Sequence, residues 1–386
     1  MNAITSHVKV QNAPMSGSSV SFRAQLRSQE ALTVWIQSQD ARLSVSPEAY
    51  VAALLLPAMY AGSDSIVVDK ALDQSFLNGV DTIQDIFQTW HPHLQRVHVV
   101  GSARERKSRR REGRTASFFT GGVDSFYSLI KHRDTIDALV YVHGFDVALG
   151  NTPLRRQVSR MVRAVGAQFE KEVIEIETTL REFSDRHAPW ERYHGAALAT
   201  VGLTLSEEFS HCIIPSSFPY NHLRIWGSHP LIDPLWSTDM VTFIHDGCEA
   251  SRFEKCKHIS GNEAVHRYLR VCWRNPEGAY NCGRCEKCIR TMTFLLAAGA
   301  LDECSTFSEA PSIKRIKRYE EIQATIRRLS YQYLPALQAL SEKPESRPLV
   351  RAIESAIQKT SLRAKVHTIL RKVRARARRV SSKFLP

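Results

Sequence analysis

The sequence has no long apolar run, no secretory signal and no cysteine among its first 211 residues. Its most apolar stretch, residues 50–60, is too short to cross a bilayer and contains Pro57, so it predicts a buried helix. The N-terminus lacks the basic region, the apolar segment and the cleavage site of a secretory signal. These absences argue against a membrane span and predict a cytoplasmic protein.

Acidic residues are scarce, since 39 aspartates and glutamates face 52 lysines and arginines, which gives a net charge of +13. The basic residues gather in the segment 104–114 and in a C-terminal tail, 363–383. Such runs favour RNA, DNA or an anionic membrane surface as partners. The alternative is a solvated tail that keeps the protein soluble.

The length of 386 residues predicts two or three domains. From residue 116, short apolar runs alternate with helical stretches, which is typical of βαβ units and of a parallel sheet covered on both faces. We therefore predict an α/β fold. The predicted segments are a flexible N-terminus (1–18), a small α+β domain (19–103), a basic linker (104–114), the α/β domain (115–250), a helical cysteine-bearing region (251–310) and a helical extension with the basic tail (311–386).

The tightest polar turn of the predicted sheet is Thr120-Gly-Gly-Val-Asp-Ser125, which follows the apolar pair Phe118-Phe119. Ligands of parallel α/β sheets bind at the carboxyl ends of the strands. Two adjacent glycines let backbone N–H groups approach an anion, and the following helix N-terminus adds unpaired N–H groups. Asp124 suits a Mg²⁺ ligand better than a direct phosphate contact. The turn predicts a polyphosphate site, and the alternative is a capped helix start without a ligand.

This turn resembles the Ser-Gly-Gly-x-Asp-Ser signature of the PP-loop ATP pyrophosphatases, with Thr120 in place of the first serine. The resemblance implies a Rossmann-like, adenine nucleotide alpha hydrolase-like sheet that binds ATP and Mg²⁺ and cleaves ATP between the α- and β-phosphates. The positions assigned to ATP are Ser117, Thr120, Gly121, Gly122, Val123, Asp124, Ser125 and His143. The positions assigned to catalysis are Asp124, Ser125 and Lys255. The lysine is a cation that stabilises charge developing on the phosphates, and the alternative is a solvated or salt-bridged surface residue.

The eight cysteines all follow residue 211, and four of them form a C-x9-C-x2-C-x2-C motif: Cys272, Cys282, Cys285 and Cys288. Clustered cysteines in a cytoplasmic chain indicate a metal rather than disulfides. Four thiolates suit tetrahedral Zn²⁺, and a site with four protein ligands is structural, not catalytic. An iron–sulfur cluster is the chemical rival. The other four are each expected to be small core residues: Cys212, Cys248, Cys256 and Cys304.

The glycine turn and the distal cysteine motif together resemble the 7-cyano-7-deazaguanine synthase branch of that family, over about residues 115–300. This chain departs from the branch at 143–146, which reads His-Gly-Phe-Asp instead of an Asp-Tyr-Gly-Gln-like stretch. The resemblance implies an AMP-forming ligase that adenylates a carboxylate or carbonyl acceptor, after which ammonia or an amine displaces AMP. The departures predict a different acceptor. A tRNA-modifying enzyme served by the basic tail and a non-catalytic nucleotide-binding partner are the alternatives.

A loop rich in polar and aromatic groups, 219–238, follows the strand predicted at Cys212. Loops at this edge of such sheets carry function disproportionately, so we expect it to shape the acceptor pocket. The alternative is that its aromatic residues belong to the core. The side chains concerned are His222, Arg224, Trp226, His229, Asp233, Trp236 and Ser237.

Overall fold

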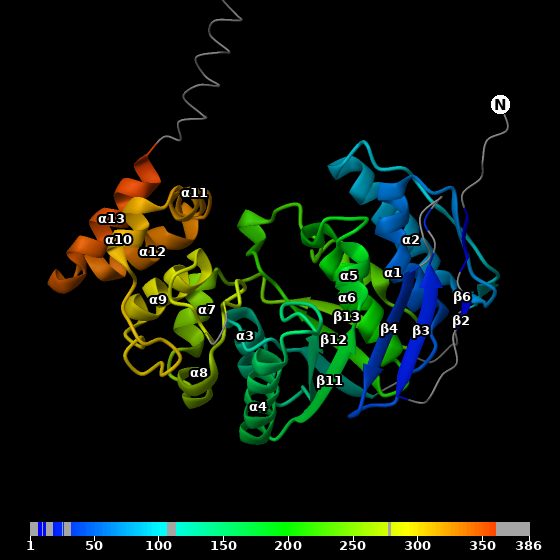
Figure 1. Ribbon diagram of the computed structural model, residues 1–386, viewed down its shortest axis with the longest axis horizontal. Helices are drawn as coiled ribbons and strands as arrows, with labels where there is room; N and C mark the ends of the chain where they lie inside the picture. Colours follow the sequence, from blue (N-terminus) through cyan, green and yellow to red (C-terminus); the bar gives the residue numbers. More distant parts are fainter. Residues whose placement is uncertain are drawn as a thin grey trace, which may run out of the picture. The chain divides into compact units, whose positions relative to one another are not determined.

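The computed structural model describes residues 7–9, 11–12, 18–24, 26, 32–105, 113–276 and 279–359 (Figure 1). They form two compact units. The first comprises the described residues up to Cys282 together with 303–306, and the second comprises 283–302 and the described residues from Phe307 onward.

The first unit is built on an eight-stranded sheet with the order β13-β12-β9-β10-β11-β4-β3-β2. The five strands from β13 to β11 run parallel, and β4 joins β11 in the antiparallel sense. The predicted α/β fold with a mostly parallel central sheet is therefore confirmed. The strands are β2 Gln11–Asn12, β3 Ser19–Ala24, β4 Leu32–Ser38, β9 Arg114–Phe118, β10 Ala138–His143, β11 Glu172–Thr178, β12 Phe209–Pro215 and β13 Thr242–Asp246.

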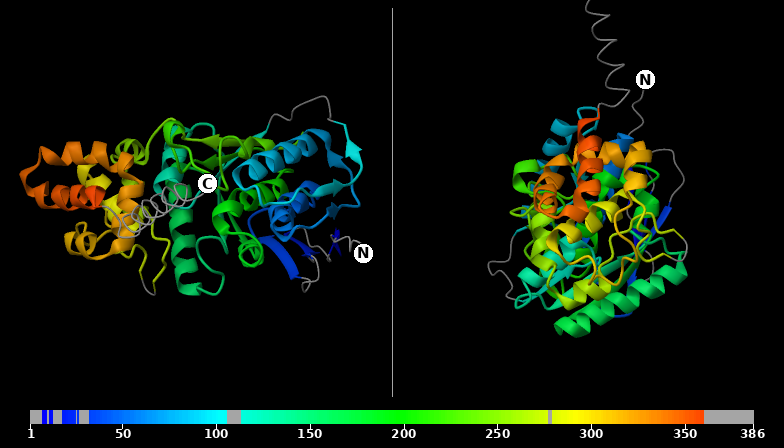
Figure 2. Two further views of the ribbon diagram at one scale, coloured as in Figure 1. Left: turned by 90° about the horizontal axis from the view of Figure 1, so that it is seen from above. Right: turned by 90° about the vertical axis from the view of Figure 1, so that its left-hand side faces the viewer.

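Helices pack on this sheet and on one another through their apolar residues. α3 packs on β9 and β12, α4 packs on β10 and β11, and α1 packs against α6 (Figure 2). The prediction of a buried helix over 50–60 is confirmed, since α1 is buried on all sides. The helices are α1 Pro47–Ala61, α2 Gln74–Trp90, α3 Val123–Lys131, α4 Thr152–Phe169, α5 Leu180–Ser184, α6 Trp190–Thr204, α7 Arg252–Ile259 and α8 Glu263–Tyr268.

The N-terminal segment differs from the separate α+β domain expected over 19–103. β3 and β4 form a hairpin that extends the central sheet, with Ser38 opposite Ile176 of β11. Val20, Phe22, Val34 and Ile36 point into the same core as the parallel strands. Their alternation marks two half-buried strands, but it cannot show which sheet they join. Two small parallel sheets complete this region, one formed by β1 His7–Lys9, β5 Ser65–Val67 and β7 His98–Val100, the other by β6 Leu72–Asp73 and β8 Ala103–Arg104.

Several predicted segments fall partly outside the described residues. Within the N-terminus expected to be flexible, β1 and β2 are strands, and residues 1–6, 10 and 13–17 are not described. The middle of the predicted linker, 106–112, and the basic tail within 360–386 also lie outside the described residues.

The second unit is helical, as expected for the C-terminal extension. Its helices are α9 Glu286–Ala298, α10 Ile313–Arg318, α11 Glu320–Arg328, α12 Ser330–Ser341 and α13 Arg347–Gln358. The division between the units falls at Cys282, inside the segment 251–310 that we expected to be one region, because α7 and α8 belong to the first unit. Within the described ranges, no helix combines the length and the apolar character needed to cross a bilayer.

The close approach of α6 to the loop after β12 depends on a glycine pair. A Cβ atom at Gly195 would lie 2.0 Å from the carbonyl oxygen of Gly227. Alanine normally favours a helix by about 1 kcal/mol over glycine, but here overpacking reverses the sign. We expect Gly195→Ala to lower the free energy of unfolding by about 1–3 kcal/mol in urea titrations. Gly150→Ala is the control, because no atom lies within 4 Å of its added Cβ. Equal urea midpoints for the two variants would contradict this packing.

Candidate functional site

The glycine turn lies at the carboxyl end of β9, in the middle of the parallel strands. Gly121 has φ +73°, a conformation that favours glycine, and a Cβ there would lie 2.6 Å from Met161 Cε of α4. Gly122 is the N-cap of α3, so no side chain of the N-cap residue covers the first N–H groups of the helix. Neither Asp124 nor Ser125 is the N-cap, which differs from the alternative of a side-chain-capped helix start.

The hydroxyl of Ser125 closes the turn. Its Oγ accepts a hydrogen bond from the backbone N of Thr120 at 3.3 Å and donates to the carbonyl oxygen of Gly122 at 3.1 Å. Thr120 itself is exposed, and its side chain stands at the open side of the turn. The turn therefore has one structural hydroxyl and one that faces solvent.

Asp124 is held between two cations from α7. Arg252 Nη2 donates to Asp124 Oδ2, and Lys255 Nζ lies 3.4 Å from Asp124 Oδ1. The side chains of Arg252 and Lys255 are only 6% and 1% exposed. Lys255 Nζ also donates to the carbonyl oxygen of Ser216 at 2.7 Å. The structure thus places the three predicted catalytic positions, Asp124, Ser125 and Lys255, at one turn.

A third cation, Arg270, was missed by the sequence analysis. Its backbone N donates to the carbonyl oxygen of Gly121 at 2.8 Å, and its side chain is buried and hydrogen-bonded through Nη2 to Asn275. Within the described ranges its Nε has no hydrogen-bond partner. The sequence carries no signal for it, because Arg270 is separated from Gly121 by most of the α/β domain. Arg252 and Lys255 outnumber the single carboxylate of Asp124, so this turn carries excess positive charge, which suits an anionic ligand.

Ser117 and His143 lie away from the open turn. Ser117 is buried in β9. His143 ends β10, and its Nε2 lies 2.8 Å from Glu175 Oε2 of β11. Burial raises the pKa of Glu175, but hydrogen bonds from His143 and Ser159 and the charge of Arg163 outweigh it and hold this pKa below its ordinary value. His143 is therefore part of a buried ion-pair network at the same edge of the sheet, one strand along from the turn.

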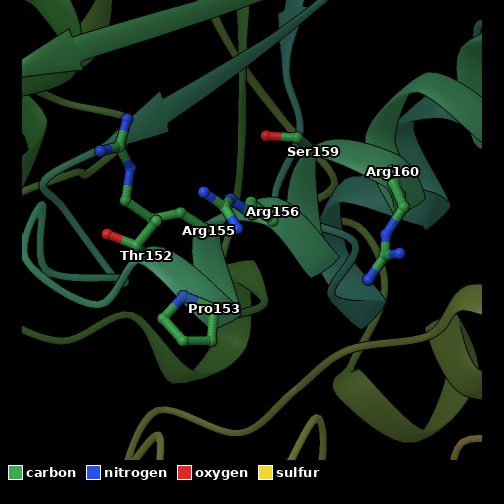
Figure 3. A pocket seen from close by; sticks show the side chains of 6 residues that line it. All are labelled: Thr152, Pro153, Arg155, Arg156, Ser159 and Arg160. Carbon is green, nitrogen blue, oxygen red and sulfur yellow. The ribbon is translucent and has the colours of Figure 1, made fainter.

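A cavity of about 750 Å³ opens at the start of α4, which follows β10 (Figure 3). Figure 3 shows Arg156 at its centre, with Arg155 on one side and Arg160 on the other. The lining residues are Thr152, Pro153, Arg155, Arg156, Ser159 and Arg160. Ser159 connects the cavity to the buried network, since its Oγ donates to Glu175 and lies 3.4 Å from His143 Nε2. The cavity is thus lined by cations and hydroxyl groups.

The loop 219–238 is partly core, as its alternative interpretation expected. Trp236 and Asp233 are fully buried and His229 is 5% exposed. The ring of Trp236 packs on Phe76, and that of His229 packs on Trp90. These buried side chains cannot line an open acceptor pocket, so the expectation is wrong for them. His222 and Arg224 are on the surface side of the loop.

Asp233 anchors this loop to the end of β13. Its Oδ2 lies 2.7 Å from His245 Nδ1 and accepts a hydrogen bond from Ser228 Oγ at 2.6 Å. Burial lowers the pKa of His245, but hydrogen bonds to Asp233 and Cys248 outweigh burial and raise it to about 9. The loop is therefore fixed by a buried ion pair at neutral pH.

The raised pKa of His245 predicts a loss of stability at alkaline pH. The ion pair contributes fully below the ordinary histidine pKa of 6.5, and its contribution is lost as the pH rises through about 9. Linkage gives an upper bound of about 3 kcal/mol for this contribution. We expect the difference in free energy of unfolding between wild type and His245→Gln to shrink between pH 6.5 and 9.5 in urea titrations. His98→Gln, at an exposed histidine, is the control. A difference that is constant with pH would contradict the ion pair.

The four cysteines of the motif converge as predicted. Their Sγ atoms all lie within 4.8 Å of one another, three of the residues are buried, and Cys282 is half-buried. Asn281 Oδ1 accepts hydrogen bonds from the backbone N of Val271 and of Cys272, so it closes the loop that separates Cys272 from Cys282. Gly283 has φ +62°, which gives the turn before Cys285.

The sulfur spacing suits one metal ion. Four thiolates about 2.3 Å from one tetrahedral ion stand about 3.8 Å apart, whereas sulfurs that each ligate a different iron of a cluster stand further apart. The group could therefore hold a metal ion such as zinc. Cys212, Cys256 and Cys304 are buried, as expected of small core residues, whereas the buried Cys248 also lies 3.2 Å from Ser216 Oγ.

In comparisons with known proteins, no family model, curated protein or solved structure matches the chain. The family resemblance of the two motifs therefore stays a prediction.

Proposed function

We propose that the protein is an ATP-dependent ligase that forms AMP. ATP binds at the turn from Thr120 to Ser125, a carboxylate acceptor attacks the α-phosphorus, and pyrophosphate leaves. Ammonia or an amine then attacks the acyl carbon of the adenylate and displaces AMP. No covalent bond to the protein is required, so the residues act by positioning and by electrostatic stabilisation.

One observation carries this proposal. A two-glycine turn at the carboxyl end of a central parallel strand has an uncapped helix start behind it, the buried cations Arg252 and Lys255 paired with its Asp124, and a backbone contact from Arg270. Each part of this arrangement favours phosphate oxygens, because backbone N–H groups, buried cations and a helix N-terminus all attract negative charge. The turn lacks the lysine of the Gly-x-x-x-x-Gly-Lys-Ser/Thr loop, which argues against release of inorganic phosphate.

Each residue of the turn has its own role in the proposed reaction. The backbone of Gly121 and Gly122 binds phosphate oxygens, and Ser125 keeps the turn closed through its bond to Gly122. Lys255 and Arg252 stabilise the negative charge that develops on the departing pyrophosphate, a role that their contacts with Asp124 at the turn support. Because both side chains are buried, they act with little screening by solvent.

Asp124 is the residue that would hold Mg²⁺, since carboxylate oxygens are the ligands that this ion prefers. Its side chain is 17% exposed and already pairs with two cations, so a bound ion would have to share or replace one of these contacts. When bound, Mg²⁺ neutralises phosphate charge.

The test is product analysis. Purified protein is incubated with α-labelled ATP and Mg²⁺, with and without a metabolite extract plus ammonium, and AMP is separated from ADP. Extract-dependent AMP is expected. ADP as the only product would overturn the proposal. ATP binding without any product would favour a non-catalytic nucleotide-binding partner.

A tRNA-modifying enzyme is the second candidate, and the net charge of +13 favours it. It predicts that AMP forms with total tRNA in place of the metabolite extract. It also predicts tRNA binding that weakens steeply with salt and is lost when residues 363–386 are deleted. If tRNA does not bind, or binds with no dependence on salt, the ligase that acts on a small molecule remains the proposed function.

A further inference from the structure

The arginines at the start of α4 are unequally neutralised. Arg155 donates to Glu177, and Arg163 pairs with Asp40 and with Glu175. Arg156 and Arg160 are exposed and make no ion pair with any described residue. The two unpaired arginines are the ones that stand at the centre and at one side of the cavity (Figure 3).

Two unpaired arginines one turn apart are unfavourable without a ligand. Residues at i and i+4 stand about 6 Å apart on a helix, and like charges there cost a few tenths of a kcal/mol. The positive end of the α4 dipole adds to the repulsion at Arg156. An anion that contacts both guanidinium groups removes this repulsion, and the exposed Thr152 offers a hydroxyl donor beside it.

Helix α4 carries both the cavity and a contact with the glycine turn. Met161, the residue after Arg160, reaches Gly121 so closely that a Cβ atom there would lie 2.6 Å from Met161 Cε. Both features are at the carboxyl edge of the parallel strands, where α/β sheets bind their ligands. A volume of about 750 Å³ is of the size that holds a small organic molecule.

We propose that this cavity binds the acceptor, a small molecule with two anionic groups that pair with Arg156 and Arg160. One group is the carboxylate that is adenylated, and the other is a second carboxylate or a phosphate. The assignment to the acceptor rests on the proposed ligase function, whereas binding of a dianion does not.

The experiment measures anion binding without ATP. Glutarate and glycerol 2-phosphate serve as probes in calorimetric titrations of the full chain, with a 20-nucleotide RNA as a third ligand. We expect saturable binding of at least one small probe, weakened at least tenfold in the double variant Arg156→Ala/Arg160→Ala. The double variant Arg133→Ala/Arg186→Ala removes the same charge from exposed positions and should bind as wild type does. Circular dichroism is expected to show both variants folded, because all four side chains are exposed.

Each outcome is decisive. Equal weakening in both double variants, or no binding of either small probe to wild type, overturns the dianion site. If the small probes do not bind, and RNA binds to wild type but not to Arg156→Ala/Arg160→Ala, the cavity binds a nucleic-acid backbone instead. If the probes bind but the protein forms no AMP, the proposal of an anion site stands and the proposed ligase function is rejected. In the product assay, the double variant is expected to need at least tenfold more extract for half-maximal AMP formation, with ATP binding unchanged.

Discussion

Asp124→Asn is expected to lower extract-dependent AMP formation at least about 10²–10³-fold, the size of effect that follows loss of one preorganised charged group. The amide keeps the shape of the side chain but removes the charge that would bind Mg²⁺ and orient Arg252 and Lys255. The rate is measured with α-labelled ATP. Asp134→Asn is the matched control, since Asp134 is 95% exposed in the loop after α3. An unchanged rate in Asp124→Asn would remove this residue from the mechanism.

The same substitution also affects folding, because it leaves two buried cations without a charged partner. Breaking a buried ion pair costs about 3–5 kcal/mol, so urea titrations must show that the variant is folded under assay conditions. Thr120→Val gives a second test. Thr120 is exposed at the turn and outside the ion pairs, so valine should leave the free energy of unfolding within about 0.5 kcal/mol of wild type. Its AMP formation is nevertheless expected to fall under the proposed function, since an exposed hydroxyl that could donate to a bound phosphate is lost. Full activity in both variants would reject the turn as the nucleotide site.

The parts of the site that the sequence predicts are those encoded locally. The glycine turn needs six consecutive residues, and the cysteine group needs sulfurs at short spacings, so both could be recognised before the structure. The mostly parallel sheet follows equally from the alternation of short apolar runs with helices. In each case, the residues that decide the structure are near one another in the chain.

The parts that could not be predicted depend on contacts between distant segments. Alternation in Val20 and Phe22 shows that they belong to a strand, but not that its hairpin would join β11. The hydrogen bond from the backbone N of Arg270 to the carbonyl oxygen of Gly121 joins two segments that are far apart in the sequence. The aromatic residues of 219–238 resemble those of a binding loop in composition, and only burial shows that Trp236 belongs to the core.

Cys285→Ser is expected to reduce bound metal from about one ion per chain to a small fraction, because it removes one of four thiolates that lie within 4.8 Å of one another. Structural Zn²⁺ sites contribute about 10–16 kcal/mol of apparent binding free energy in zinc-finger peptides, so the segment 269–292 should become sensitive to protease once metal is lost. Elemental analysis of the purified protein measures zinc and iron together. Zinc is expected, since the sulfurs are spaced for a single tetrahedral ion. A chelator should reproduce the protease sensitivity in wild type.

Cys304→Ser provides the control for this substitution. Cys304 is also buried, but it lies outside the four-cysteine group, so its serine variant loses some stability and keeps its metal. The two variants therefore separate the general cost of a buried hydroxyl from the specific loss of a ligand. If the protein contains iron and absorbs near 400 nm, the cysteines hold an iron–sulfur cluster and not zinc. Full metal content in Cys285→Ser would show that this thiolate is not a ligand. Because four thiolates would leave a bound tetrahedral ion no open position for a substrate, its loss should lower AMP formation only in proportion to the folded fraction.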